Sequence, residues 1–300
     1  MILICAYYKP MFAQRRENLT DYLPENRLLR GGFLLLRRYW RHRVAIQSAA
    51  LAFYLLFAVF PFLIFISALI GLLQLDVAAI LGHLRDLVPD DILYLAEMYL
   101  RYVGENSNVR LLLFGLVFSV YFPMRATNAL MRSVRTAYHL GPPRATVWHW
   151  IKTLLYTLLL IAAIALTLML LTVSDRFLAY GVRSLRLPAV VARLWAALRF
   201  PLAGVVGYFA LLLLYAAAQD SRQPWQNIWP GTLAALVAWL GISWGYGLYV
   251  EHIAHYSALY GSIGAVIVLL IWLNITAVIL IMGAEWNGML MSLRRERAES

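Results

Sequence analysis

Charged residues are scarce in this chain. Asp, Glu, Lys and Arg make up 14% of its 300 residues, and apolar residues make up 62%, whereas a soluble domain carries about 25% charged residues. This composition excludes an ordinary water-soluble globular domain and favours a chain that is solvated mainly by lipid. Cysteine is scarcer still, because Cys5 is the only one. An intrachain disulfide and an all-cysteine metal site are therefore excluded.

Long stretches of the chain hold no charge near their centre. A helix needs ~20 apolar residues to cross a hydrocarbon core of ~30 Å, and six segments satisfy or approach this requirement, at about 44–75, 109–124, 150–174, 200–219, 229–250 and 261–284. The second is short and requires Arg110 to extend its guanidinium to the interface. We expect an all-α polytopic membrane protein with six transmembrane helices, whose first span is not a cleaved signal peptide.

The basic residues predict the orientation and the flanking domains. The formal net charge is +11, and most Lys and Arg lie in residues 1–43, between the second and third spans, and in residues 286–300. Cytoplasmic loops carry such an excess, so we expect residues 44–285 to form the membrane domain, with both termini on the cytoplasmic side of a bacterial inner membrane. The same rule accounts for most of the positive charge, so we expect no nucleic acid as a partner.

Amphipathic interfacial helices are expected beside the spans. The segment 27–43 mixes arginine with Phe33, Leu36 and Trp40, a pattern typical of a basic helix that contacts anionic lipid headgroups. The apolar positions after Pro188 predict a second interfacial helix. Its arginines oppose the charge rule, because that segment belongs on the outer side.

The most specific pattern lies in the last hundred residues. Trp229-Pro230-Gly231 opens the fifth span, Tyr260-Gly261-Ser262 precedes the sixth, and Gly283-Ala284-Glu285 with Asn287 closes it. This pattern resembles the YihY/BrkB family of bacterial inner-membrane proteins, and the resemblance covers roughly residues 27 to 292. It departs from the family at Asn274, where an aromatic residue is usual, and at Trp286, where leucine is usual. The resemblance implies a link to envelope integrity or serum resistance.

An older label described this family as a tRNA-processing ribonuclease. Zinc-dependent hydrolysis needs several His and Asp ligands that converge on the metal. The six histidines are instead spread along the chain, at His42, His83, His139, His149, His252 and His255. We therefore expect no enzyme activity, no cofactor and no metal site.

The polar residues inside the spans are mostly uncharged, which disfavours a proton relay. They predict a substrate cavity. Pro61 belongs to the predicted cavity because it kinks the first span. For any one of them, the alternative is a hydrogen bond that merely holds two helices together. For Glu285 the alternative is structural pairing with a headgroup or with an arginine such as Arg125. The predicted cavity residues are Tyr54, Pro61, Ser243, Tyr246, Asn274 and Glu285.

Small residues in the fifth and sixth spans predict close packing or a hinge. Gly241 and Gly245 have the small-xxx-small spacing of helix interfaces and permit a homodimer. Gly261, Ser262 and Gly264 form a small-residue group where the sixth span begins. A break there would provide a hinge between helices.

Two functions fit these features. The first is a transporter or flippase-like protein that moves an amphiphilic, lipid-related substrate in the cell envelope. The second is a non-transporting envelope scaffold or regulator. A cavity lined by Tyr54, Ser243, Tyr246 and Asn274 would favour transport, and a solid bundle would favour the scaffold.

Overall fold

The computed structural model describes residues 27–72, 108–141, 147–172, 189–219, 224–252 and 262–299, together with 93–94, 97–98 and 102. The elements in this part of the chain are helical. Six of the helices are long and apolar enough to cross a membrane, which confirms the predicted all-α organisation. The elements are α3 (Arg27–Arg41), α4 (Val44–Leu72), α7 (Val109–Ala137), α8 (Val147–Thr172), α10 (Ala189–Ala218), the 3-10 turn η1 (Trp225–Asn227), α11 (Trp229–His252) and α13 (Ser262–Glu299).

Local sequence signals set several helix ends. The Asn108 side chain accepts a hydrogen bond from the Leu111 backbone N–H at 2.9 Å, which satisfies one of the free donors at the start of α7. Among the described residues other than glycine, two adopt left-handed backbone conformations: Arg43 (φ 53°) between α3 and α4, and His139 (φ 55°) after α7. These conformations end one helix and turn the chain into a new direction.

Three helices extend beyond their predicted ends. Helix α7 continues past Met124 to Ala137, α10 begins at Ala189 and passes through position 200, and α13 continues to Glu299. The predicted ends were placed where charged residues appear. Arginine and glutamate are good helix formers, so the backbone hydrogen bonds continue after the apolar stretch ends. The interfacial helix expected after Pro188 is therefore the first part of α10.

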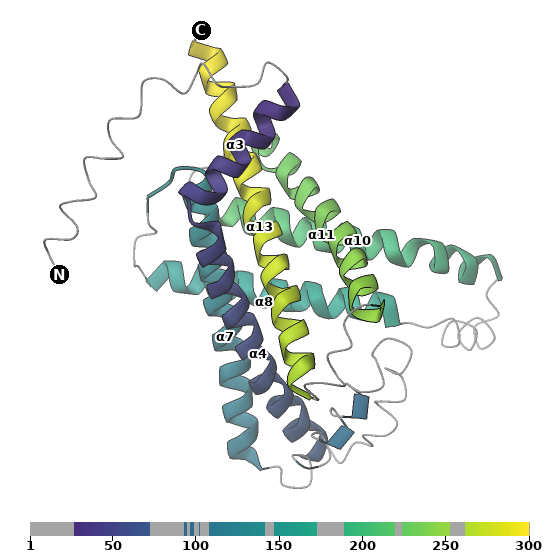
Figure 1. The fold of residues 1–300 in the computed structure, drawn as a ribbon. Helices are drawn as coiled ribbons and strands as arrows, with labels where there is room; N and C mark the ends of the chain where they lie inside the picture. Colours follow the sequence, from purple (N-terminus) through teal and green to yellow (C-terminus); the bar gives the residue numbers. More distant parts are fainter. Residues whose placement is uncertain are drawn as a thin grey trace, which may run out of the picture.

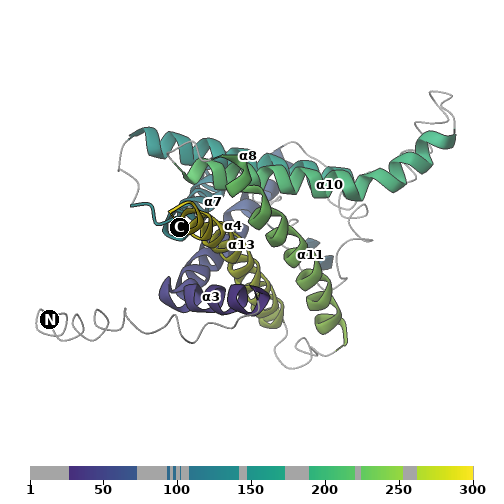
Figure 2. The same ribbon diagram turned by 90° about the horizontal axis from the view of Figure 1, so that it is seen from above.

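Helices α4, α7 and α13 run side by side, and α11 lies next to α13 (Figure 1). Helices α8 and α10 pack against each other and run across the direction of that group, as both views show (Figures 1 and 2). The pair leaves large apolar side chains uncovered, such as Leu155, Met169 and Phe200. In a membrane protein such surfaces face lipid, because acyl chains are as apolar as leucine.

The best-packed region lies where α4 begins, where α7 and α10 end, and in the second half of α13. Val44, Val134, Ala137, Tyr215 and Ala284 are completely buried there. Helix α3 lies against α13 on the side of the bundle opposite the α8–α10 pair (Figure 2). The fold therefore brings α3, the first described helix, and α13 together at one end of the described bundle.

Candidate functional site

Five elements meet at this end of the bundle: α3, the start of α4, the end of α7, the start of α11 and the second half of α13. The Arg38 guanidinium of α3 donates a hydrogen bond to the Ala137 carbonyl at the end of α7, at 3.1 Å. The Asn287 side chain of α13 donates to the Ile228 carbonyl just before α11, at 2.6 Å. We name this region the helix junction.

Glu285 is the carboxylate of the helix junction, and its side chain is only 1% exposed. Its Oε2 accepts a hydrogen bond from Arg38 at 3.2 Å, and its Oε1 lies 2.6 Å from His42 Nδ1. Arg38 also donates to Ser292 Oγ at 3.2 Å, about two helical turns further along α13. Glu285 therefore ties α3 and the start of α4 to the last helix.

The arginine considered from the sequence is not the partner of Glu285. Arg125 donates a hydrogen bond to the Tyr54 hydroxyl at 3.4 Å and lies over that ring, 5.5 Å from its centroid. This contact joins α4 to α7. Tyr54, one of the predicted cavity residues, therefore contacts the Arg125 guanidinium in the described structure.

A second histidine approaches the cluster from the residue after the C-cap of α7. The rings of His42 and His139 are 5.7 Å apart between centroids and almost perpendicular. Partial burial lowers the pKa of His139, and the positive charges of Arg38, His42 and Arg41 lower it further, against the opposing effect of Glu285. The physical causes are the loss of water and like-charge repulsion. His139 therefore resists protonation beside this cluster.

Tyr138 anchors the end of α7 to the segment before α11. Its hydroxyl donates to the Asn227 carbonyl at 3.0 Å. Burial raises the pKa of this phenol, so it stays a neutral donor. Arg135, one turn earlier, donates to the carbonyls of Gly141 at 2.8 Å and Ala218 at 3.1 Å, which connects α7 to the end of α10.

Close backbone approach makes the helix junction possible. A Cβ added at Gly283 would lie 2.6 Å from Ala235 Cβ and 2.8 Å from the Gly231 carbonyl oxygen, both shorter than van der Waals contact. The Tyr215 hydroxyl donates to the Leu280 carbonyl nearby. Glycine at 283 is thus required for α11 and α10 to approach α13 this closely.

Polar side chains continue along the interface between α11 and α13. Trp239 Nε1 donates to Thr276 Oγ1 at 3.1 Å, Trp272 Nε1 lies within hydrogen-bonding distance of Ser243 Oγ at 3.4 Å, and the Tyr246 hydroxyl donates to the Val268 carbonyl at 2.8 Å. Two predicted cavity residues, Ser243 and Tyr246, therefore bond across this pair of helices.

The other residues singled out from the sequence lie apart from one another. Pro61 is buried inside α4, and Asn274 is half-buried on α13. Gly264 is buried, Ser262 is the first residue of α13, and Gly261 lies outside the described residues. A Cβ added at Gly241 or Gly245 would meet nothing within 4 Å. Those two glycines do not pack against another helix of the described chain, and their role in a homodimer stays a prediction.

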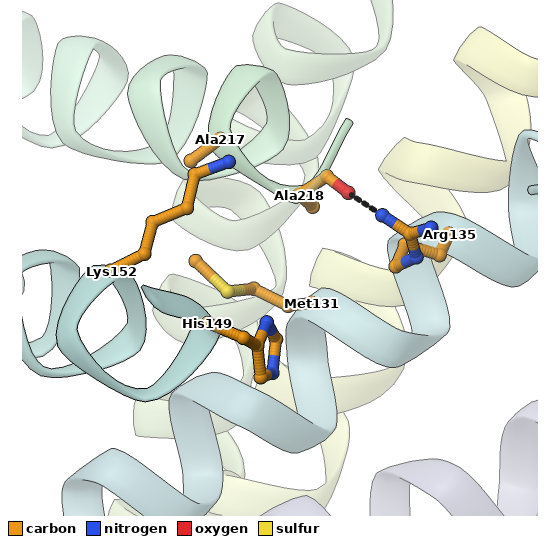
Figure 3. A pocket seen from close by; sticks show the side chains of 6 residues that line it. All are labelled: Met131, Arg135, His149, Lys152, Ala217 and Ala218. Carbon is orange, nitrogen blue, oxygen red and sulfur yellow. Dashed lines mark hydrogen bonds between the residues drawn. The ribbon is translucent and has the colours of Figure 1, made fainter. Parts of the chain in front are cut away.

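A small pocket lies beside the helix junction, between α7, α8 and the end of α10 (Figure 3). Its volume is about 10 Å³, which is room for about one water molecule. Arg135 reaches toward Ala218 from α7, while His149 and Lys152 come from the first turns of α8 (Figure 3). None of the predicted cavity residues lines it. The lining residues are Met131, Arg135, His149, Lys152, Ala217 and Ala218.

Metal-ligating side chains do not gather in the part of the chain that the structure describes. Among those residues there is no group of three or more His, Cys, Asp or Glu that could hold a metal ion. The contacts that the helix junction does show are charge pairing and hydrogen bonding between helices.

Comparison with known proteins decides the family. The model of the family described as "Virulence factor BrkB" matches residues 35–300. The chain belongs to this family. The match includes α3 from residue 35 onward and the whole helix junction, so the contacts among Arg38, His42 and Glu285 lie inside the BrkB-family region.

Individual relatives of this BrkB-family chain carry different names. The protein YfkH of Bacillus subtilis (strain 168), named ribonuclease-like, is 29% identical over 256 residues, which are 85% of this chain and 93% of YfkH. The UPF0761 membrane protein Smlt0865 of Stenotrophomonas maltophilia (strain K279a) is 23% identical over 279 residues, 89% of this chain. The match covers only 62% of Smlt0865. No solved structure matches this chain.

Sequence reasoning missed the partners of Glu285. The sequence pattern places Arg38 in the basic interfacial helix expected at 27–43, and His42 among six histidines spread along the chain. The spacing of Arg38 and His42, four residues apart, was the available signal, because such a pair can face one neighbour from a helix and its following turn. Nothing local indicated that this neighbour would be a residue 247 positions away.

Proposed function

We propose that this BrkB-family membrane protein moves an amphiphilic, lipid-related substrate within the cell envelope, and that the cluster of Glu285, Arg38 and His42 gates that movement. The observation that carries this proposal is the burial of a carboxylate between two basic side chains in the second half of a membrane helix. Ionisable residues in such positions are expensive and are usually functional.

The energetic argument favours a gate over a simple structural clamp. Taking two charges out of water costs several kcal/mol per ion in proteins, so a buried ion pair is a poor device for stability alone. The same pair has two sharply different states, because separated partners regain water. An interaction of that kind suits a contact that opens and closes.

The mechanism follows from the elements that the cluster connects. With the cluster formed, α3 is held against α13 and the start of α4 is tied to Glu285. Separation of Arg38 from Glu285 frees α3 and lets α4 and α13 diverge at this end. An amphiphile would then pass between the helices, with its polar part near the released charges and its chains in lipid.

The test is reconstitution of the purified protein in liposomes that contain a labelled phospholipid in one leaflet. The proposal expects the label to change leaflets faster than in protein-free vesicles prepared in parallel. Vesicles with a matched amount of an unrelated helical membrane protein control for defects that any inserted helix causes. Rates equal to that control would rule transport of this lipid class out.

A non-transporting scaffold is the second candidate, and one observation favours it. Ser243 and Tyr246 are engaged in hydrogen bonds between α11 and α13, which is the arrangement expected of side chains that hold helices together. As a scaffold, the protein would present α3 and its exposed Phe33, Leu36 and Trp40 to anionic headgroups. Lipid exchange at control rates, with retained binding to anionic vesicles, would favour this alternative.

We also propose a cytoplasmic location for both termini in the bacterial inner membrane, without nucleic acid as a partner and without hydrolytic activity. The support is the gathering of basic residues at the helix junction, where Arg37, Arg41 and Arg132 are exposed. Fluorescent-protein and alkaline-phosphatase fusions at either terminus test this orientation. Phosphatase activity from either fusion would reverse it, and cleavage of precursor tRNA by the purified protein would overturn the non-enzymatic assignment.

A further inference from the structure

The pocket between α7, α8 and α10 is lined by basic and apolar side chains. Three of its six lining residues, Arg135, His149 and Lys152, have basic side chains, and none is acidic. Arg135 and Lys152 approach it from opposite sides, with His149 at its edge and Met131 between them (Figure 3). Oriented N–H donors around a hollow favour an oxyanion, and arginine matches the geometry of phosphate particularly well.

The pocket is held in shape by contacts that do not depend on a ligand. Arg135 is buried, and its donation to the Gly141 and Ala218 carbonyls fixes its position. The Nε2 atom of His149 lies 3.2 Å from Asn128 Oδ1. Arg135 and His149 are therefore ordered before any anion arrives, which reduces the entropy lost on binding.

The size of the pocket limits what can enter it. A volume of about 10 Å³ admits about one oxygen-sized group, so the greater part of any ligand must lie outside. The exposed side of α8 is apolar: Trp148, Ile151 and Leu155 are 69%, 51% and 64% exposed. These positions form one stripe on the helix, next to the position of Lys152.

We propose that this pocket binds the phosphate of an anionic phospholipid: an oxygen of the phosphate enters between Arg135, His149 and Lys152, and the acyl chains lie on the apolar stripe of α8. Basic pockets between membrane helices on the cytoplasmic side are typical sites for such headgroups. A free phosphate shares the headgroup chemistry but makes no use of the stripe. The site serves a transporter and a scaffold alike, so it does not rest on the proposed function.

The experiment counts retained lipids by native mass spectrometry of full-length protein, purified with phosphatidylglycerol or with phosphatidylcholine. The key variant is Lys152→Gln. The matched control is Arg132→Gln, which removes one charge from an exposed position of α7 outside the pocket. We expect the unmodified protein and Arg132→Gln to retain one phosphatidylglycerol more than Lys152→Gln does, and Lys152→Arg to restore it.

Two further measurements distinguish a lipid phosphate from free inorganic phosphate and do not depend on whether a variant folds. Inorganic phosphate at millimolar concentration should not displace the retained lipid. A photoactivatable phosphatidylglycerol, applied to the unmodified protein, should label peptides that contain residues 148–155. The proposal is overturned by equal loss in both glutamine variants, by no loss in either, by displacement with inorganic phosphate, or by labelling that avoids the first turns of α8.

Discussion

The Asn287 side chain bridges α13 to the backbone around Gly231 at the start of α11. Its Oδ1 accepts a hydrogen bond from the Gly231 N–H at 2.6 Å, and its Nδ2 donates to the Ile228 carbonyl at 2.6 Å. Asn287 is completely buried. One amide thus supplies both an acceptor for a free N–H at the helix start and a donor to the carbonyl before it.

Removing this amide should destabilise the protein. In Asn287→Ala a buried donor and a buried acceptor lose their partners, and each such loss costs about 1–3 kcal/mol. We expect a fall in Tm of roughly 5 °C or more in detergent, measured by intrinsic fluorescence. Asn287→Asp should be no better, because it places a second oxygen against the Ile228 carbonyl. Asn274→Ala on the same helix is the control, and an equal fall there would refute a specific role for Asn287.

Glycine substitutions should separate the tight contact from the open face. A Cβ at position 283 would lie 2.6 Å from Ala235 Cβ and 2.9 Å from the Tyr215 hydroxyl, whereas one at 241 would meet nothing within 4 Å. We expect Gly283→Ala to lower both expression and Tm, and Gly241→Ala to lower neither, because alanine is the better helix former by about 1 kcal/mol. Thermal melting of the two variants, purified identically, provides the comparison. A tolerated Gly283→Ala would contradict the packing described here.

Acid should weaken the helix junction through His139. Its pKa is lowered in the folded protein by burial and by the charges of Arg38, His42 and Arg41, so the unfolded chain binds the proton more readily. Stability attributable to this residue is therefore lost as the pH falls below the unfolded value of about 6.5. His139→Asn retains a residue that tolerates the left-handed conformation and removes the titration. Its Tm should fall less between pH 7 and pH 5 than that of the unmodified protein. A fall of the same size would show that His139 does not contribute.

The sequence contained enough information for the helices, because long apolar segments can satisfy their backbone only as helices in lipid. It also singled out Glu285, because a carboxylate at the end of an apolar helix is unusual. It could not identify Arg38 and His42 as the partners, since that depends on how α3 docks against α13. The same limit applies to Ser243 and Tyr246: their polarity was visible, but whether they face a passage or another helix is a matter of tertiary packing.

The glycines illustrate the same limit of prediction from sequence. Gly241 and Gly245 attracted attention through their regular spacing, yet neither contacts another described helix. Gly283 lies against Ala235 and has no glycine, alanine or serine four residues before or after it. Close approach depends on which helix faces the glycine. Spacing alone cannot provide that information.

The most direct test of the proposed gate is the lipid-exchange rate of Glu285→Gln in liposomes. Glutamine keeps the shape of the side chain but removes the charge that holds Arg38 and His42, so the open state should become more populated. If the closed state loses about 1.4 kcal/mol of stability, the ratio of open to closed protein rises roughly tenfold. The control is Glu251→Gln, which removes an exposed carboxylate from the last turn of α11. The account predicts faster exchange for Glu285→Gln alone, and an unchanged or equally changed rate in the two folded variants would contradict it.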